Sequence, residues 1–169
     1  MTAVPAVQLA LISDTHLPRG QRRLPAECLR RLREVDHIVH AGDLVELEVL
    51  DRLQALGPPV SAVLGNSDRA SLRSFLPERV ELAVGGGRIG VVHDAGPAGG
   101  RLERLRRRFP QADAVVFGHS HIPLLEERSG FQIFNPGSPT DRRRQPQFTM
   151  GIATVGQGSV RFELVTLAA

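Results

Sequence analysis

Near its start the chain reads VQLALISDTH, residues 7–16. The first six of these residues are apolar except for Gln8, as in a strand that is buried on both faces of a sheet. The run ends in Asp14 and His16, a carboxylate and an imidazole only two positions apart. Polar side chains directly after a buried strand are typical of open α/β sheets, in which sites form beyond the carboxyl ends of the strands. The stretch therefore predicts an α/β fold whose first strand leads into a functional loop.

The same arrangement, an apolar run followed by a polar side chain, recurs further along the chain. Strands are expected at 38–40, 60–64, 88–93 and 114–117. The polar side chains at or just beyond the ends of these runs are Asp43, Asn66, His93, His119 and His121. Loops from several strand ends converge at one edge of such a sheet, so we expect these side chains to meet there around a metal ion.

The other elements follow from helical spacing and from turn residues. We expect a helix that begins at Pro25, a second over 47–53 that ends before Gly57, and a third over 102–109 that ends at Pro110. Further strands are expected at 79–84, 124–128, 131–135, 148–155 and 159–165, bounded by glycine-rich turns.

Each polar residue has an ordinary explanation when it is taken alone. Asp43 could cap the next helix, Asn66 follows a glycine as in common turns, and a lone His93 could be a satisfied core histidine. The pair His119 and His121, which flanks a single residue after a strand, is the strongest single signal. Chance is a poor explanation for five strand ends that all carry metal-competent side chains, so we interpret them as one site.

Size and composition predict a single domain, 1–169, and limit the classes of partner. A domain of this length buries about 70% of its unfolded surface and needs no disulfides. The single cysteine, Cys28, fits a reducing, cytoplasmic setting. No apolar run reaches the length of a membrane span, and residues 3–12 lack the preceding basic residue of a signal peptide. All 21 basic residues are arginine, yet the net charge of +3 is too small to predict nucleic-acid binding.

The motifs supply two carboxylates, one amide and four imidazoles, donors that suit Mn, Fe or Zn. In order they run Asp-x-His, Gly-Asp, Gly-Asn, a single His and Gly-His-x-His, which resembles the calcineurin-like metallophosphoesterase family. The likeness covers most of the chain. Residues 65–68 (GNSD) and 135–138 (NPGS) resemble the small bacterial and archaeal phosphodiesterase branch of that family. The resemblance implies a four-layer α/β/β/α sandwich with two mixed β-sheets.

The resemblance also implies a ligand set and a reaction. One divalent ion would be held by Asp14, His16 and His121 and a second by Asn66, His93 and His119, with Asp43 bridging both. A carboxylate between two ions about 3.5–4 Å apart offsets their repulsion, and the ions acidify a bridging water. The expected function is a dinuclear metal-dependent phosphodiesterase in which a metal-bridging hydroxide attacks phosphorus in line, with Asp43, Asn66 and His93 as catalytic residues. Manganese is the expected metal, and Fe, Zn, Co and Ni also tolerate these ligands.

Two positions depart from the family pattern. Many members have histidine directly after the Gly-Asn pair, where it contacts phosphate or protonates the leaving group, but this chain has Ser67, a candidate substrate-binding residue. Because serine is a poor general acid near neutral pH and a positioned acid contributes about 10²–10⁴-fold, we expect slow turnover or a preference for good leaving groups. Asp68, which would partner that histidine, is expected to cap a short helix instead. Asp94 replaces a common glycine, either as a hydrogen-bond partner of a ligand imidazole or as a plain loop residue.

Arginines border the predicted site on two loops. Arg142 and Arg143 follow the Asn-Pro-Gly-Ser turn, and they either bind a substrate phosphate or belong to a mobile loop. The loop 18–25 carries three arginines of its own and is a comparable candidate. The arginines of the helix over 102–109 are expected on a solvated face, with Glu103 paired to Arg107.

Three classes of function compete for this sequence. A phosphoesterase that acts on a small phosphate ester is favoured, because all seven ligand positions are present. The alternative is a weakly active or inactive metal-binding scaffold, since a relative of this branch, the scaffold subunit of the retromer sorting complex, mainly holds partners. A nuclease ranks last, because the chain has no Tyr or Trp on which bases could stack. We expect no membrane or nucleic-acid partner and leave a homo-oligomer open, with the apolar segment 148–155 as a candidate for pairing between copies.

Overall fold

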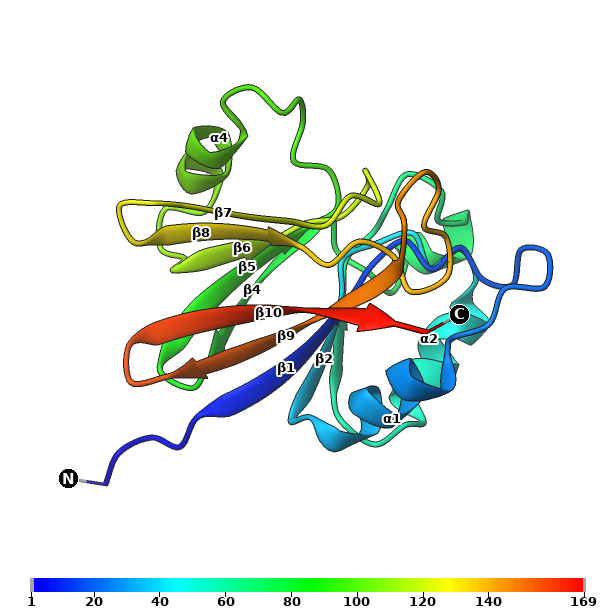
Figure 1. The fold of residues 1–169 in the computed structure, drawn as a ribbon, viewed down its shortest axis with the longest axis horizontal. Coiled ribbons are helices and arrows are strands. Elements are labelled where there is room, and N and C mark those ends of the chain that lie inside the picture. Colours follow the sequence, from blue (N-terminus) through cyan, green and yellow to red (C-terminus); the bar gives the residue numbers. More distant parts are fainter. Residues whose placement is uncertain (1, 169) are drawn as a thin grey trace.

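The computed structural model describes residues 2–168, which form two β-sheets packed face to face with helices on both outer sides (Figure 1). Helices α1 (Ala26–Glu34) and α2 (Leu47–Gln54) cover one sheet, and α4 (Arg101–Arg108) covers the other. This arrangement confirms the predicted four-layer sandwich with two mixed sheets.

The first sheet has the strand order β10-β9-β1-β2-β3. Its strands are β1 (Val7–Ile12), β2 (His37–His40), β3 (Val60–Ala62), β9 (Phe148–Gly156) and β10 (Ser159–Leu167). The strands β1, β2 and β3 are parallel, and β9 and β10 extend the sheet with antiparallel pairing. Because the three parallel strands end at one edge of the sheet, the loops that follow them are neighbours.

The second sheet has the order β4-β5-β6-β8-β7. Its strands are β4 (Arg79–Val84), β5 (Gly87–Val92), β6 (Ala114–Val116), β7 (Leu124–Arg128) and β8 (Phe131–Asn135). Here β5, β6 and β8 are parallel, and the edge strands β4 and β7 are antiparallel to their neighbours. The loops after β5 and β6 therefore also leave from a shared edge.

Alternating side chains along the central strands fill two different layers of the core. In β1, Leu9 and Leu11 point between the two sheets, whereas Ala10 and Ile12 point towards the helices. All four side chains are fully buried. This burial on both faces explains why the segment 7–12 is apolar at nearly every position.

The helices close the outer faces with one apolar side each, as their spacing predicts. From α1, Cys28 and Leu32 pack on the first sheet, and from α4, Leu102 and Leu105 pack on the second. Burial raises the pKa of Cys28 to about 12, so this thiol serves packing rather than chemistry. Within residues 2–168, no helix combines the length and the apolarity needed to span a membrane.

Three local expectations are wrong. The segment 148–155 lies in β9, which pairs with β1 on one side and β10 on the other, so it has no free edge for a second copy. The strand expected at 60–64 ends at Ala62, because the N–H of Leu64 donates to Pro77 rather than to a neighbouring strand. Glu103 forms its ion pair with Arg128 of β7 instead of with Arg107.

Candidate metal centre

Five loops bring the predicted ligands together beyond the ends of β1, β2, β3, β5 and β6. Backbone hydrogen bonds continue between these loops after the strands end. The N–H of Asp14 donates to Gly42 O at 2.9 Å, and the N–H of His16 donates to Asp43 O at 3.0 Å. The N–H of Gly118 likewise donates to His93 O at 3.0 Å. The loops are thus fixed to one another before any ion is considered.

The first half of the centre contains Asp14, His16 and His121, all three buried. Nε2 of His121 lies 3.5 Å from Asp14 Oδ1 and 3.3 Å from Nε2 of His16. Oδ2 of Asp14 accepts hydrogen bonds from Ser13 Oγ and from the N–H of His119, but the buried Oδ1 has no partner among the described residues. A buried carboxylate oxygen without a donor, facing two imidazole nitrogens, fits a metal cation.

The second half contains Asn66, His93 and His119. Oδ1 of Asn66 lies 2.9 Å from His93 Nε2 and 3.0 Å from His119 Nδ1. Asp43 lies between the two halves, because its Oδ2 is 3.3 Å from His93 Nε2 and 3.4 Å from His16 Nε2. The structure therefore brings all seven predicted ligand residues together, with Asp43 at the centre.

Hydrogen bonds on the far side of two imidazoles determine which nitrogen faces the centre. Nδ1 of His93 donates to Ala41 O at 2.7 Å, and Nδ1 of His121 donates to Asp141 O at 2.5 Å. A ring that donates from Nδ1 to a carbonyl presents an unprotonated Nε2 to a metal. Both rings are thus prepared as Nε2 ligands.

The ionisation of these side chains is strongly perturbed. Burial raises the pKa of Asp14 to about 7 and lowers that of His16 to about 4. Burial alone would lower the pKa of His93, but Asp43 and Asp14 outweigh it and raise that pKa to about 8. Burial would raise the pKa of Asp43, yet hydrogen bonding and the charge of His93 hold it well below its usual range. Charge and burial of this kind are typical of functional sites.

These pKa values predict that metal binding competes with protons. Asp14 and His93 must both lose a proton to bind a cation, and their pKa values lie near 7 and 8. Lowering the pH from 8 to 6 protonates both groups, so the affinity for Mn²⁺ or Zn²⁺ should fall by about tenfold or more. Calorimetry in two buffers of different ionisation enthalpy measures the affinity and the protons released. Replacing the exposed Asp94 with asparagine should leave this dependence unchanged, and a pH-independent affinity in the wild type would contradict the prediction.

Five of the seven candidate ligands have a backbone in the left-handed region. The φ angles are 56° for Asp14, 46° for His16, 63° for Asp43, 74° for His119 and 62° for His121. This region costs about 1–2 kcal/mol for a residue other than glycine. Such clusters of strained residues occur at functional sites, where the surrounding hydrogen bonds hold them in place.

Asp68 holds two of the ligand loops together, a role that sequence analysis missed. Its buried carboxylate accepts the backbone N–H groups of Asp43 at 3.1 Å, Val45 at 2.6 Å and Gly65 at 2.7 Å. The expected helix cap is wrong, because α3 (Ala70–Arg73) has Arg69 at its N-cap and no side-chain capping bond. Asp68 was visible in the sequence, but two of its three partners, Asp43 and Val45, lie on another loop.

Replacing Asp68 with asparagine should loosen both loops. Asparagine has one acceptor oxygen and an NH₂ group that would face a backbone N–H, so at least one of the three hydrogen bonds is lost. We expect a loss of stability of about 1–3 kcal/mol and a 10- to 100-fold weaker metal affinity. The matched control is Asp113→Asn, since Asp113 also accepts a backbone N–H, that of Arg88, on another loop. Equal metal affinities for the two variants would contradict this role.

Other polar side chains hold the remaining loops. His40, fully buried, accepts the N–H of Gly42 at Nδ1 and donates from Nε2 to Thr15 Oγ1 at 3.0 Å. Burial lowers the pKa of His40 to about 3, so the ring is neutral. Ser138 Oγ donates to the carbonyl of Asp14. His40 therefore lies behind the ligands rather than among them.

The Asn-Pro-Gly-Ser turn has a structural role that its residues alone did not reveal. Asn135 donates from Nδ2 to Gly118 O at 3.1 Å and to Ser120 Oγ at 3.2 Å. It therefore shapes the loop that carries His119 and His121. Asp94, by contrast, accepts the N–H of Gly96 in a solvent-exposed turn, which supports the interpretation of a plain loop residue.

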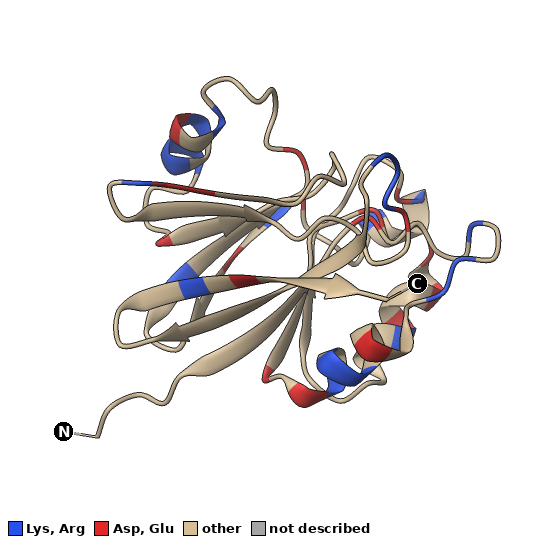
Figure 2. Ribbon diagram, viewed as in Figure 1, with Lys and Arg blue, Asp and Glu red and all other residues tan. Residues whose placement is uncertain are grey.

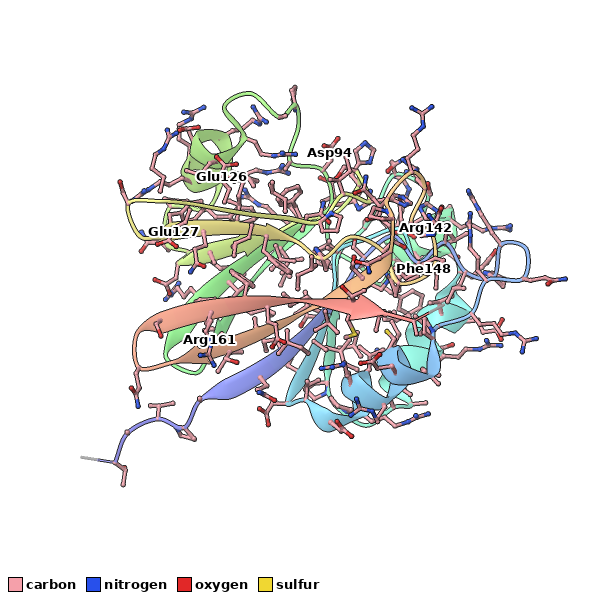
Figure 3. All side chains as sticks on the ribbon, in the orientation of Figure 1. Asp94, Glu126, Glu127, Arg142, Phe148 and Arg161 are labelled. Carbon is pink, nitrogen blue, oxygen red and sulfur yellow. The ribbon has the colours of Figure 1, made fainter. Side chains whose placement is uncertain are left out.

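The three candidate substrate-binding residues differ in how they lie. The N–H of Ser67 donates to Asp43 Oδ1 at 2.8 Å, so Ser67 lies directly beside the central carboxylate. Arg142 stacks its guanidinium over Phe148 at 5.6 Å and donates to Gln145 O, so its charge is turned onto its own loop (Figure 3).

Arg143 is exposed, and its positive charge acts on the candidate ligand His121. Burial lowers the pKa of His121, and the positive charge of Arg143 lowers it further. Figure 2 shows this loop and the loop 18–25 carrying arginine at the same end of the sandwich. Of the two predicted arginines, Arg143 is therefore the one whose charge acts on a candidate ligand.

Comparison with known proteins identifies a family from the sequence and a shared fold among solved structures. A family model described as a calcineurin-like phosphoesterase superfamily domain matches residues 7–158. A curated probable metallophosphoesterase of Methanocaldococcus jannaschii is 36% identical over 135 residues, which cover 78% of this chain and 68% of the relative. The structure of Entamoeba histolytica Vps29 complexed with Zn²⁺ is 25% identical, with a TM-score of 0.73 over 94% of this chain and 98% of that one. An archaeal phosphodiesterase shares the fold, at 20% identity and a TM-score of 0.71 over 94% of this chain and 99% of that one.

Proposed function

Because the chain belongs to the calcineurin-like phosphoesterase superfamily, we propose that it is a dinuclear metal-dependent phosphoesterase that prefers phosphodiesters. The observation that carries this proposal is the position of Asp43, whose Oδ2 lies within 3.4 Å of imidazole nitrogens from both halves of the centre. A shared carboxylate is what two closely spaced cations require.

The proposed ligands divide as the contacts do. One ion would be held by Asp14, His16 and His121, and the other by Asn66, His93 and His119, with Asp43 shared. The unpartnered Oδ1 of Asp14 and the Nδ1-donating rings support this division. We propose manganese as the metal, although these oxygen and nitrogen donors also suit Fe, Zn, Co and Ni. The Zn²⁺ complex of a structural relative supports a transition metal in general.

When bound, two such ions would supply an acidified water as the nucleophile and neutralise charge on the phosphate oxygens. The residues of the chain would fix the positions of the ligand atoms and set the net charge of the site. Asp43 is held by the N–H of Ser67 at 2.8 Å, which leaves its Oδ2 directed at the histidines. Neutral imidazoles and the amide of Asn66 keep the loaded site cationic, which favours a phosphate ester over a neutral substrate.

The site lacks a histidine that could protonate the leaving group. Ser67 stands where many family members have histidine, and a hydroxyl is a poor proton donor near neutral pH. We therefore propose that esters with acidic leaving groups, such as nitrophenolate, react faster than alkyl esters. A steep dependence of kcat on the leaving-group pKa is the expected result.

A second candidate is a metal-binding module that holds protein partners and turns over slowly. The likeness to Vps29 favours it, since that protein is named for vacuolar sorting rather than for hydrolysis. The complete ligand set favours the enzyme instead. We further propose a cytoplasmic location, supported by the single buried thiol of Cys28.

The deciding experiment compares hydrolysis of bis(4-nitrophenyl) phosphate with that of 4-nitrophenyl phosphate, with and without added Mn²⁺. The proposal predicts metal-dependent release of nitrophenolate, faster from the diester. If a folded protein hydrolyses neither ester with any divalent metal, the enzymatic proposal is wrong and the binding module becomes the better one. A faster monoester reaction would overturn only the diester preference.

A further inference from the structure

A cavity of about 370 Å³ lies beside the candidate metal centre. Its lining comes from Pro18, Arg19, Val45, Glu46, Ser67 and Arg69. Two of these residues follow His16 within three positions, two follow Asp43 within three, and one directly follows Asn66. The cavity therefore opens next to three candidate ligands, and its size lies in the range of small-molecule pockets. A group attached to a phosphate at the centre has room to extend into it.

The walls of this cavity are fixed to the same frame as the ligands. The N–H of Arg19 donates to His16 O at 3.1 Å. Leu17 and Val45 pair across the two loops as an isolated β-bridge. The N–H of Val45 is in turn held by Asp68. The distance between the cavity and the metal centre is therefore set by hydrogen bonds rather than by loose loops.

Of the three charged side chains that line the cavity, two form an ion pair and one arginine has no carboxylate partner among the described residues. Glu46 and Arg69 neutralise each other, since a carboxylate oxygen lies 2.7 Å from the guanidinium Nε. For Arg19, no carboxylate in residues 2–168 lies within ion-pair distance. Pro18 and Val45 supply apolar surface. The N–H of Ser67 contacts the candidate ligand Asp43. The cavity thus combines a partly apolar wall with one uncompensated guanidinium.

We propose that this cavity is a specificity subsite for an oxyanion on the substrate, bound by Arg19. The preferred substrates are then phosphodiesters whose second ester group carries a carboxylate or a phosphate. This inference rests on the proposed function, since it places the reacting phosphate at the metal centre. A guanidinium binds either oxyanion through two parallel hydrogen bonds, so the subsite selects the charge and its distance from the reacting phosphorus.

Matched substrates test the proposal through turnover. Phenyl, 4-carboxyphenyl and 4-phosphonophenyl esters of 4-nitrophenyl phosphate release the same leaving group and differ only in the distal charge. The wild type should show a kcat/KM about tenfold higher for an anionic ester at low salt, and the larger gain identifies the preferred oxyanion. Arg19→Gln should reduce this ratio to about one. The control Arg73→Gln removes an exposed arginine that does not line the cavity and should keep the ratio.

Equilibrium binding separates the subsite from the enzymatic proposal. Phenylphosphonate and 4-carboxyphenylphosphonate cannot be hydrolysed, so calorimetry with the metal-loaded protein reports on the subsite even without turnover. The wild type and Arg73→Gln should each bind 4-carboxyphenylphosphonate about tenfold more tightly than phenylphosphonate. Arg19→Gln should bind the two probes with equal affinity. Equal affinities of the two probes for the wild type, or a preference that survives Arg19→Gln, would overturn the subsite. In that case, metal-dependent hydrolysis of the phenyl ester would still support the proposed phosphodiesterase function.

Discussion

Asp43→Asn is expected to lower kcat for metal-dependent diester hydrolysis by about 10³-fold or more. The two side chains have the same shape, and an asparagine Oδ1 can still accept the N–H of Ser67. The substitution instead removes the negative charge that lies between His16 and His93 and turns an NH₂ group towards their Nε2 atoms. Without that charge, the repulsion between two cations is no longer offset. We therefore expect one bound ion per chain instead of two.

Three measurements together check this result. Nitrophenolate release gives kcat, elemental analysis gives the number of ions per chain, and thermal unfolding shows that the variant is folded. The control is Asp51→Asn, an exposed carboxylate on α2 that should leave all three unchanged. A folded Asp43→Asn protein that keeps two ions and more than about a tenth of the activity would show that Asp43 does not bridge them.

Phe134→Ala is expected to cost about 3–5 kcal/mol of the free energy of unfolding. The ring is almost completely buried between the two sheets, where it stacks on Phe162 at a centroid distance of 4.7 Å and an interplanar angle of 3°. It also packs against Gly151, where a methyl group would come within 2.4 Å of the ring. Removing the ring leaves a cavity that the two paired sheets cannot close without breaking their registers.

Urea unfolding monitored by circular dichroism measures this loss as a lower transition midpoint at a similar slope. Phe75→Ala is the matched control, because the same side chain there is 63% exposed and its removal should change stability by only about 0.5 kcal/mol. Similar midpoints for the two variants would mean that the inter-sheet layer is not tightly packed.

The fold was largely predictable because its signals are local. The residues 7–12 and 114–116 are apolar at nearly every position, since each strand is buried between a sheet and a helix layer. The polar residues after these strands could be placed at the sheet edge without knowing the topology. All seven candidate ligands were found in this way, and the structure brings them together.

What the sequence did not predict depends on contacts between distant segments. Asp68 looked like a helix cap because capping is local, but its three partners include residues 23 and 25 positions away. Arg142 carries charge, yet only the three-dimensional structure shows that Phe148 lies beneath it. Spacing along a helix could not reveal that Glu103 has a closer partner on β7. The sequence pattern predicts which helix, strand or loop a residue belongs to, but it does not predict which of several side chains or backbone groups that residue contacts.

The left-handed backbone at five candidate ligands also constrains how such a site can change during evolution. Glycine, asparagine and aspartate adopt positive φ angles at a lower steric cost than β-branched residues such as valine and isoleucine. A lineage that abandoned the chemistry would thus replace Asp14 or Asp43 more readily by asparagine or glycine than by an apolar residue. The loop geometry would outlast the activity, and descendants would keep the outline of a metal centre after losing its charge. Whether a relative of this fold has ceased to be an enzyme is therefore to be judged from the charges at these positions rather than from the shape of the loops.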